Sequence, residues 1–145
     1  VQLCDLQIAA DTCEFALTPA RFGIGYKLDD IALLTSNISA KYAKELLFTA
    51  ARFPSSVALR WGLINRTVSE GSLNETVDGL ARDIAANAPL SVAAAKAIIH
   101  EAVKQEALRD VEMCARLVAE CDASGDRLEG QSAFSEKREP HFTGL

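Results

Sequence analysis

The chain has 145 residues, of which 49% are hydrophobic and 24% charged, and its 20 acidic and 15 basic side chains give a net charge of −5. This length and composition suit a globular protein with an apolar core. The acidic balance argues against a nucleic-acid or anionic-membrane surface, because phosphate binding needs clustered Lys and Arg, and no apolar run approaches membrane-spanning length.

The N-terminal quarter is predicted to form two strands, a turn and a helix. Alternating apolar residues favour strands over residues 3–10 and 13–17. The segment Pro19–Gly25 has the proline and glycines typical of a turn. The following helix is expected to use Asp29 or Asp30 as its cap, because a short carboxylate side chain accepts from the first free N–H groups.

The next segment predicts two helices and a strand. Ser39 is expected to cap a helix over residues 40–49. A second helix should begin at Pro54-Ser55 and end at Gly62, since glycine adopts the left-handed conformation of a helix terminus at little cost. Residues 63–68 are then strand-like.

The C-terminal half is predicted to be helical from Ser72 onward. Ser91 is expected to cap a helix over residues 92–103, and a loop over 122–126 should precede a last helix over 129–138. Two apolar stripes at helical spacing consist of Leu73, Val77, Leu80 and Ile84, and of Ala107, Val111, Cys114, Val118 and Cys121. Such stripes in a small chain predict packing against another subunit or domain.

The cysteines indicate whether a metal site or disulfides are expected, and the first residues indicate whether the chain has a signal peptide. Cys4, Cys13, Cys114 and Cys121 lack the spacing of a metal site, so no metal is expected. Small buried thiols are favoured for the last two, in a reducing cytoplasm. The chain begins with Val1 inside a predicted strand and without a signal-peptide pattern, so we expect an upstream part of the protein to precede it.

Five strings occur in order along the chain: "CDLQIAADTCEFAL", "AKELLFTA", "ALRWGLINRTV", "IAANAPLSVAAAK" and "GDRLEGQSAFSEKREPHF". They match a C-D strand followed by a short strand ending in phenylalanine, an A-x-E-x-x-x-T-G helix, an A-x-x-x-G-L-V turn, a helix pair and an E-G-x-x-A-F-x-E-K-R terminus. Over essentially its whole length the chain therefore resembles the C-terminal half, or slightly more, of a member of the crotonase superfamily, the enoyl-CoA hydratase/isomerase family. Each string alone is weak evidence for the family, whereas five strings in the family's order are a specific signal.

The resemblance implies an α/β fold in two parts. Residues 1–70 would form the C-terminal part of a ββα spiral core, and residues 71–145 a helical trimerisation module. The implied partners are an acyl-CoA substrate and further copies of the protein, in a homotrimer or a dimer of trimers. The CoA thioester enters as substrate, and no cofactor, nucleic acid or membrane is implied.

The resemblance also implies a type of chemistry. Family members hold an acyl-CoA thioester so that two backbone N–H groups donate to its carbonyl oxygen and stabilise an enolate. Hydratases add two glutamates, which activate water and deliver a proton. The match places both N–H donors and the first glutamate upstream of Val1, so this chain alone is expected to turn over no thioester.

The second glutamate of the family is replaced in this sequence. The family reads F-x-x-P-E-x-x-x-G, whereas this chain reads Phe15-Ala-Leu-Thr-Pro19-Ala-Arg-Phe-Gly23. A gapless register puts Pro19 at the glutamate position, and an insertion of one residue would put Ala20 there. Neither side chain can accept or deliver a proton, so the catalytic residues are left open.

The turn that follows differs as well. The family's P-G-x-G-G aligns with Tyr26-Lys-Leu-Asp-Asp30, where bulk and negative charge replace glycines that let a backbone approach a ligand closely. Tyr26 is either a phenol donor to the acyl group or an aromatic wall of the pocket. Asp29 and Asp30 are either helix caps or polar groups of the site.

The substrate site implied by the resemblance is made of Pro19, Ile24, Gly25 and Tyr26, with CoA contacts from Phe134 and Lys137. In the family, the equivalents of the last two lie near the adenine and the phosphates, often those bound by a neighbouring subunit. Their spacing of three places both on one helix face. On composition alone they would be a core aromatic and a solvated lysine.

Three functions remain open at this point. The first is an enoyl-CoA hydratase/isomerase-family enzyme that forms an oxyanion-stabilised enolate without the usual glutamate. The second is another lyase of the same fold, a decarboxylase or isomerase with different acids. The third is a non-catalytic paralogue or fragment that serves in subunit assembly.

Overall fold

A computed structural model of the chain describes residues 4–145 and divides it into two compact units, Val1–Asp78 and Gly79–Leu145. Each unit is built around its own buried residues. Part of the strand predicted over residues 3–10 lies outside the described residues.

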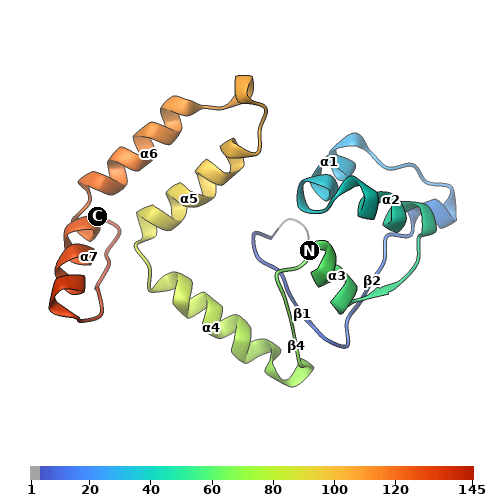
Figure 1. Ribbon diagram of the computed structural model, residues 1–145, viewed down its shortest axis with the longest axis horizontal. Helices are drawn as coiled ribbons and strands as arrows, with labels where there is room; N and C mark the ends of the chain where they lie inside the picture. Colours follow the sequence, from blue (N-terminus) through green and yellow to red (C-terminus); the bar gives the residue numbers. More distant parts are fainter. Residues whose placement is uncertain (1–3) are drawn as a thin grey trace. The chain divides into compact units, whose positions relative to one another are not determined.

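The strands of the first unit form two short pairs (Figure 1). β1 (Ile8–Ala10) pairs in parallel with β4 (Arg66–Val68), and β2 (Glu14–Phe15) pairs antiparallel with β3 (Phe53–Pro54). The strands are shorter than their sequence patterns suggested, because pairing extends over three residues in the first case and two in the second.

The first helices of this unit surround the predicted turn. The 3₁₀-helix η1 (Pro19–Phe22) forms the turn and ends at Gly23 with φ of 68°. α1 (Leu28–Asn37) follows, with Lys27 at its N-cap position. The prediction that Asp29 or Asp30 caps this helix is therefore wrong: both lie inside the first turn, where the positive end of the helix dipole favours their charge.

The next two helices agree with their predicted limits. α2 (Ala40–Thr49) begins after Ser39, which occupies the cap position, although its side chain makes no capping hydrogen bond. α3 (Ser55–Trp61) ends at Gly62, whose φ of 80° confirms the left-handed terminus. A second 3₁₀-helix, η2 (Glu70–Ser72), leads into α4.

The core of the first unit joins α1, α2 and α3 to the two strand pairs. Ala58 is fully buried, and the ring of Trp61 lies between those of Tyr42, 5.1 Å away, and Phe53, 4.9 Å away. The buried Ser55 hydroxyl donates to the carbonyl of Asp11 (3.1 Å) and accepts from the Thr67 hydroxyl (3.2 Å). These contacts hold both strand pairs against α3.

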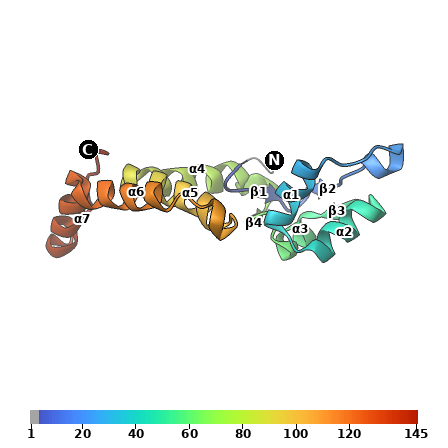
Figure 2. The same ribbon diagram turned by 90° about the horizontal axis from the view of Figure 1, so that it is seen from above.

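The remaining helices make up the C-terminal part. α4 (Leu73–Ala85) runs across the division between the units; α5 (Pro89–Ala102), a 3₁₀-helix η3 (Glu106–Leu108), α6 (Val111–Ala123) and α7 (Gly125–Glu136) follow. α5 and α6 lie side by side and antiparallel (Figures 1 and 2).

Three sequence predictions for this part are corrected. α5 begins at Pro89, so Ser91 is not its cap; proline suits the first helical position because no N–H partner is needed there. Residues 122–126 are not a loop, since α6 runs to Ala123 and the Ser124 hydroxyl caps α7 by accepting from the Arg127 amide (3.2 Å). α7 therefore starts earlier than residue 129.

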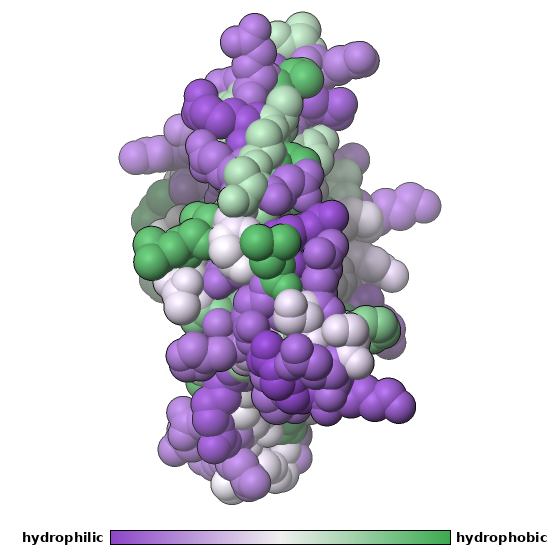
Figure 3. Space-filling view, turned by 90° about the vertical axis from the view of Figure 1, so that its left-hand side faces the viewer, coloured by the Kyte–Doolittle hydropathy of each residue, from purple (hydrophilic) through white to green (hydrophobic). Residues whose placement is uncertain are grey.

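Many apolar side chains of this part are exposed. Figure 3 views the side of the molecule that carries α6 and α7 and shows apolar residues among charged ones. The exposed apolar side chains of the C-terminal part include Ile84, Val92, Ile99, Val103, Leu108, Val111, Val118, Leu128 and Phe134. All four cysteines are free, and Cys114 and Cys121 are half-buried rather than buried.

Two carboxylates on α7 hold the C-terminal tail. Buried Asp126 accepts from the backbone amides of Thr143 (2.7 Å) and Gly144 (2.9 Å). Glu129, one turn later, accepts from the amide of His141 (2.7 Å). The tail therefore folds back along the helix.

Candidate functional site

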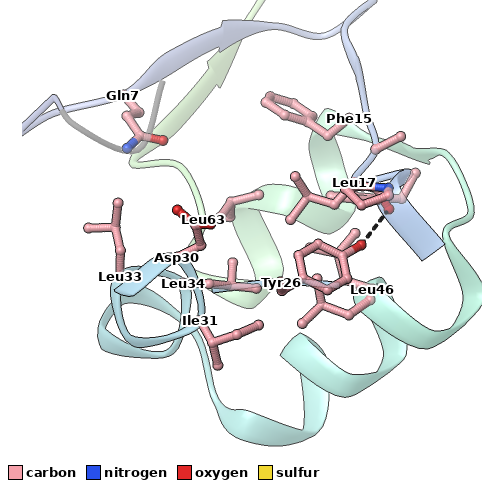
Figure 4. Close-up of a pocket in the computed structure, with 14 residues that line it drawn as sticks. Gln7, Phe15, Leu17, Tyr26, Asp30, Ile31, Leu33, Leu34, Leu46 and Leu63 are labelled. Atoms are coloured by element: carbon pink, nitrogen blue, oxygen red, sulfur yellow. Dashed lines mark hydrogen bonds between the residues drawn. The ribbon is translucent and has the colours of Figure 1, made fainter. Parts of the chain in front are cut away.

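A cavity of about 500 Å³ opens in the first unit, bounded by β2, the turn, α1 and α2 (Figure 4). Its volume lies in the range of small-molecule sites. Most lining side chains are apolar: Phe15, Ala16, Leu17, Pro19, Ile31, Leu33, Leu34, Leu46, Leu47, Phe53 and Leu63. The polar exceptions are Gln7, Tyr26 and Asp30.

The turn predicted to carry the chemistry supplies part of the cavity wall. Pro19 occupies the first position of η1 and lines the cavity. Its carbonyl accepts from the Ile24 amide (3.1 Å), and the carbonyl of Thr18 accepts from the Arg21 amide (2.9 Å). These two hydrogen bonds close the turn. The side chain of the turn that lines the cavity is Pro19, which has no ionisable group.

Tyr26 brings a phenol to the cavity. Its ring is half-buried and packs against the core, while its hydroxyl makes a long hydrogen bond of 3.5 Å to the carbonyl of Leu17 (Figure 4). Because a phenol oxygen also accepts, it retains lone pairs for a ligand. Tyr26 is therefore both a wall of the pocket and a polar group.

The two aspartates are separated by the geometry of α1. Both side chains are exposed, but Asp30 also lines the cavity, where it is the one charged side chain among the described lining residues, and Asp29 lies outside the lining. No lysine or arginine is among the lining residues. An anionic group placed in this cavity would therefore meet apolar walls and one carboxylate.

Sequence reasoning missed Gln7, which is only 9% exposed and lines the same cavity. Its backbone is fixed: its amide donates to Oδ1 of Asn65 (2.7 Å), and its carbonyl accepts from the amide of Asn65 (2.8 Å). Its side-chain Oε1 is buried and has no hydrogen-bond partner among the described residues. The available signal was the strand period of two, which places residue 7 on the same face as buried Ala9.

The other predicted site residues lie elsewhere. Ile24 is 59% exposed, and it and Gly25 lie outside the lining of the cavity. Phe134 belongs to the second unit, where it is 87% exposed at the edge of an open hollow of about 680 Å³. Lys137 follows the end of α7 with φ of 55°, so the helical face assumed for this pair stops at Glu136.

Two further findings concern the described part of the chain. Within residues 4–145, no three His, Cys, Asp or Glu side chains are grouped so that they could hold a metal ion. None of the helices found there has the length and apolarity needed to cross a bilayer.

Comparison with known proteins gives consistent matches over the whole chain. A family model described as enoyl-CoA hydratase/isomerase matches residues 1–145. Carnitinyl-CoA dehydratase of Citrobacter koseri is 33% identical over 144 residues, covering 97% of this chain and 55% of that protein. Methylmalonyl-CoA decarboxylase of Escherichia coli is 34% identical over 145 residues, covering 97% and 54%.

Solved structures agree with the sequence matches. A structure from Hyphomonas neptunium, described as a member of an enoyl-CoA hydratase/isomerase family, superposes with a TM-score of 0.88 at 29% identity, covering 99% of this chain and 55% of that one. Enoyl-CoA hydratase from Bacillus anthracis gives a TM-score of 0.84 at 30% identity, covering 99% and 56%. The chain spans about half the length of the curated relatives it matches.

Proposed function

Because the chain belongs to the enoyl-CoA hydratase/isomerase family, we propose that its protein acts on an acyl-CoA thioester whose acyl group enters the cavity beside Pro19. The reaction passes through a thioester enolate, stabilised by two backbone N–H donors that the family resemblance places upstream of this chain. The family match confirms the resemblance and the fold class predicted from the motifs, an α/β spiral-core part followed by a helical part.

The choice between possible reactions depends on the replacement of the family's second glutamate. Addition of water to an enoyl thioester needs a base that activates the water and an acid that delivers a proton. Pro19, which the gapless register puts at the family's glutamate position, lines the cavity, and no glutamate is among its described lining residues. A reaction that needs no carboxylate at this position is favoured.

Decarboxylation of a 2-carboxyacyl thioester meets that condition. The bond between Cα and the carboxylate breaks, CO₂ leaves, and the electron pair passes into the enolate, whose carbon then takes a proton from a water molecule, leaving hydroxide that the solvent neutralises. Apolar walls favour this step, because they solvate the compact charge of a carboxylate poorly and the charge is spread over the enolate in the transition state. The Tyr26 phenol supplies a polar contact for the acyl group, and the 34% identity to methylmalonyl-CoA decarboxylase supports this assignment.

A second candidate is dehydration of a hydroxyacyl thioester. Asp30 lines the cavity and is the one carboxylate there that could exchange a proton with a ligand. The 33% identity to carnitinyl-CoA dehydratase favours this candidate. It differs from the first in requiring Asp30 for turnover.

The test uses the protein expressed from its complete reading frame. Malonyl-CoA, methylmalonyl-CoA, crotonyl-CoA and 3-hydroxybutyryl-CoA are supplied separately, and the acyl-CoA products are separated by chromatography. We expect loss of CO₂ from a carboxyacyl thioester and little hydration of crotonyl-CoA. Efficient hydration would overturn the proposal, and neither turnover nor thioester binding would favour the assembly role.

We also propose that Phe134 and Lys137 contact CoA and that the protein is a trimer or a dimer of trimers. The exposed position of Phe134 and the uncovered apolar side chains of α5, α6 and α7 support both statements. Sedimentation velocity on the complete protein tests the assembly, and a monomer at micromolar concentration would contradict it.

A further inference from the structure

The side-chain Oε1 of the buried Gln7 accepts no hydrogen bond from the described residues. The backbone N–H and carbonyl of this residue both bond to Asn65, and the carbonyl also accepts from the Arg66 amide at 3.3 Å. These contacts fix the start of β1 without the side chain. Its Oε1 nevertheless lies out of reach of solvent and has no partner among the described residues. Buried polar atoms are normally paired, so this one calls for an explanation.

The side chain points into the cavity from the side opposite Tyr26. Figure 4 shows the carboxamide above Leu33 and Leu63, while Tyr26 and Leu17 lie across the cavity near the turn. A ligand that places its thioester at the turn would therefore extend its distal end toward Gln7. The volume of about 500 Å³ leaves room for such a chain.

The chemistry of the unpaired atom defines its ligand. An amide oxygen accepts hydrogen bonds, so it requires a donor, and its neighbours Leu33 and Leu63 supply none. An ammonium group would lose most of its hydration between apolar walls, and the exposed carboxylate of Asp30, the one charge among the described lining residues, would offset that cost only in part. A hydroxyl is neutral, donates one hydrogen bond and can accept another from the amide nitrogen.

We propose that Gln7 is a specificity-determining residue that selects acyl groups carrying a hydroxyl on the part remote from the thioester. The inference rests on the proposed acyl-CoA function and adds the chemistry of the distal end of the substrate. The burial of the Gln7 side chain on a fixed backbone restricts the carboxamide before the ligand binds, so less conformational freedom is lost on binding.

The test measures binding and needs no turnover. Calorimetry on the complete protein compares hexanoyl-CoA with 6-hydroxyhexanoyl-CoA and octanoyl-CoA with 8-hydroxyoctanoyl-CoA, with 6-aminohexanoyl-CoA as the cationic ligand. The hydroxylated member of at least one pair should bind roughly three- to tenfold more tightly, the gain typical of one neutral hydrogen bond. If no thioester binds, the proposed function fails; if both members of each pair bind equally, only this inference fails. Preference for the ammonium ligand would also overturn it.

Two variants of Gln7 separate recognition from a structural role. Gln7→Met and Gln7→Leu should abolish the hydroxyl preference and keep or raise the melting temperature, because each removes an unpaired buried polar atom. Gln105→Met, at an exposed glutamine, is the matched control and should keep the preference. A retained preference in either Gln7 variant, or a large loss of stability in both, would overturn the inference.

Discussion

The guanidinium of Arg138 binds both carboxylate oxygens of Glu129, with Nη1 2.6 Å from Oε1 and Nη2 2.9 Å from Oε2. The same Oε1 accepts from the backbone amide of His141 at 2.7 Å. These bonds hold the pKa of Glu129 at about 2, chiefly through the Arg138 side chain and then the His141 amide. The pair thus joins α7 to the residues that follow it.

Replacing Arg138 with lysine should loosen this connection. Lysine keeps the positive charge but cannot form the two parallel bonds of a guanidinium. Amide hydrogen exchange at His141 and Thr143 should accelerate by roughly two- to fivefold, as for a partly exposed ion pair. Arg116→Lys, at an exposed pair on α6, is the control. Unchanged exchange in Arg138→Lys would show that the charge alone holds the tail.

The tail should resist mild acid. The pKa of Glu129 is lower in the folded protein than in the unfolded chain, so its contribution to stability is complete above the ordinary value of 4.5 and is lost as the pH falls toward 2. Protection of the His141 amide should therefore stay constant from neutral pH down to about 4.5 and then decline. Glu129→Gln should remove that decline. A decline centred near pH 6 would contradict the assignment.

Glu101 should stabilise the connection between α5 and α6. It is 8% exposed, its Oε1 accepts from Lys104 Nζ (2.6 Å), and its Oε2 accepts from the Asp110 amide (2.9 Å). Glu101→Ala leaves that amide unpaired, so we expect the melting temperature to fall by roughly 3–6 °C. Glu106→Ala, at an exposed glutamate, should change it little.

The same carboxylate predicts a direction of pH dependence. The Asp110 amide and then the Lys104 side chain lower the pKa of Glu101 below its ordinary value. Its stabilising effect is therefore present above that value and is lost as the pH falls through the lowered pKa. Calorimetric scans between pH 7 and pH 3 should show a steeper acid loss for the parent protein than for Glu101→Ala. Parallel curves would contradict this.

Gly62 should tolerate no other residue without cost. Its φ is 80°, and a Cβ there would lie 3.4 Å from the carbonyl oxygen of Asn37. Gly62→Ala should lower the free energy of unfolding by about 1–2 kcal/mol, the cost of a left-handed conformation. Gly71→Ala is the control, because its φ is not positive and its Cβ would meet open space. Chemical denaturation of both variants provides the measurement.

Tyr26 should matter for turnover through its hydroxyl. Tyr26→Phe keeps the ring in the cavity wall and removes the phenol, so kcat should fall on the order of ten- to hundredfold if that hydroxyl contacts the reacting group. Tyr42→Phe is the matched control, because Tyr42 stacks on Trp61 in the core. Equal kcat values for Tyr26→Phe and Tyr42→Phe would show that Tyr26 only lines the pocket and that its hydroxyl takes no part in turnover.

Sequence reasoning predicted the helices and strands where local chemistry decides their limits. The end of α3 at Gly62 and the start of α2 after Ser39 follow from glycine geometry and cap position. Sequence reasoning failed where two neighbouring residues could each mark the start of a helix. Asp29 and Asp30 looked like caps, but Lys27 holds that position, and Ser91 was preferred although Pro89 starts the helix.

The site was predictable only in part. Pro19, Tyr26 and Asp30 lie in the segment that the motifs singled out, and all three line the cavity. Gln7 was missed because it lies just before β1, outside the turn that was expected to carry the chemistry, and the strand period of two indicates only that it shares a face with Ala9. Its role depends on burial and on the missing partner of one oxygen, which are properties of the folded chain.

The parallel pairing of β1 with β4 also has a kinetic consequence. Gln7 and Asn65, at the start of this pairing, are separated by 58 positions in the sequence. Closing so long a loop costs chain entropy before the contact is gained, whereas the neighbouring helices α2 and α3 form from local contacts. During refolding, the helices should thus acquire structure first, and the strand pairing that orients Gln7 should come late.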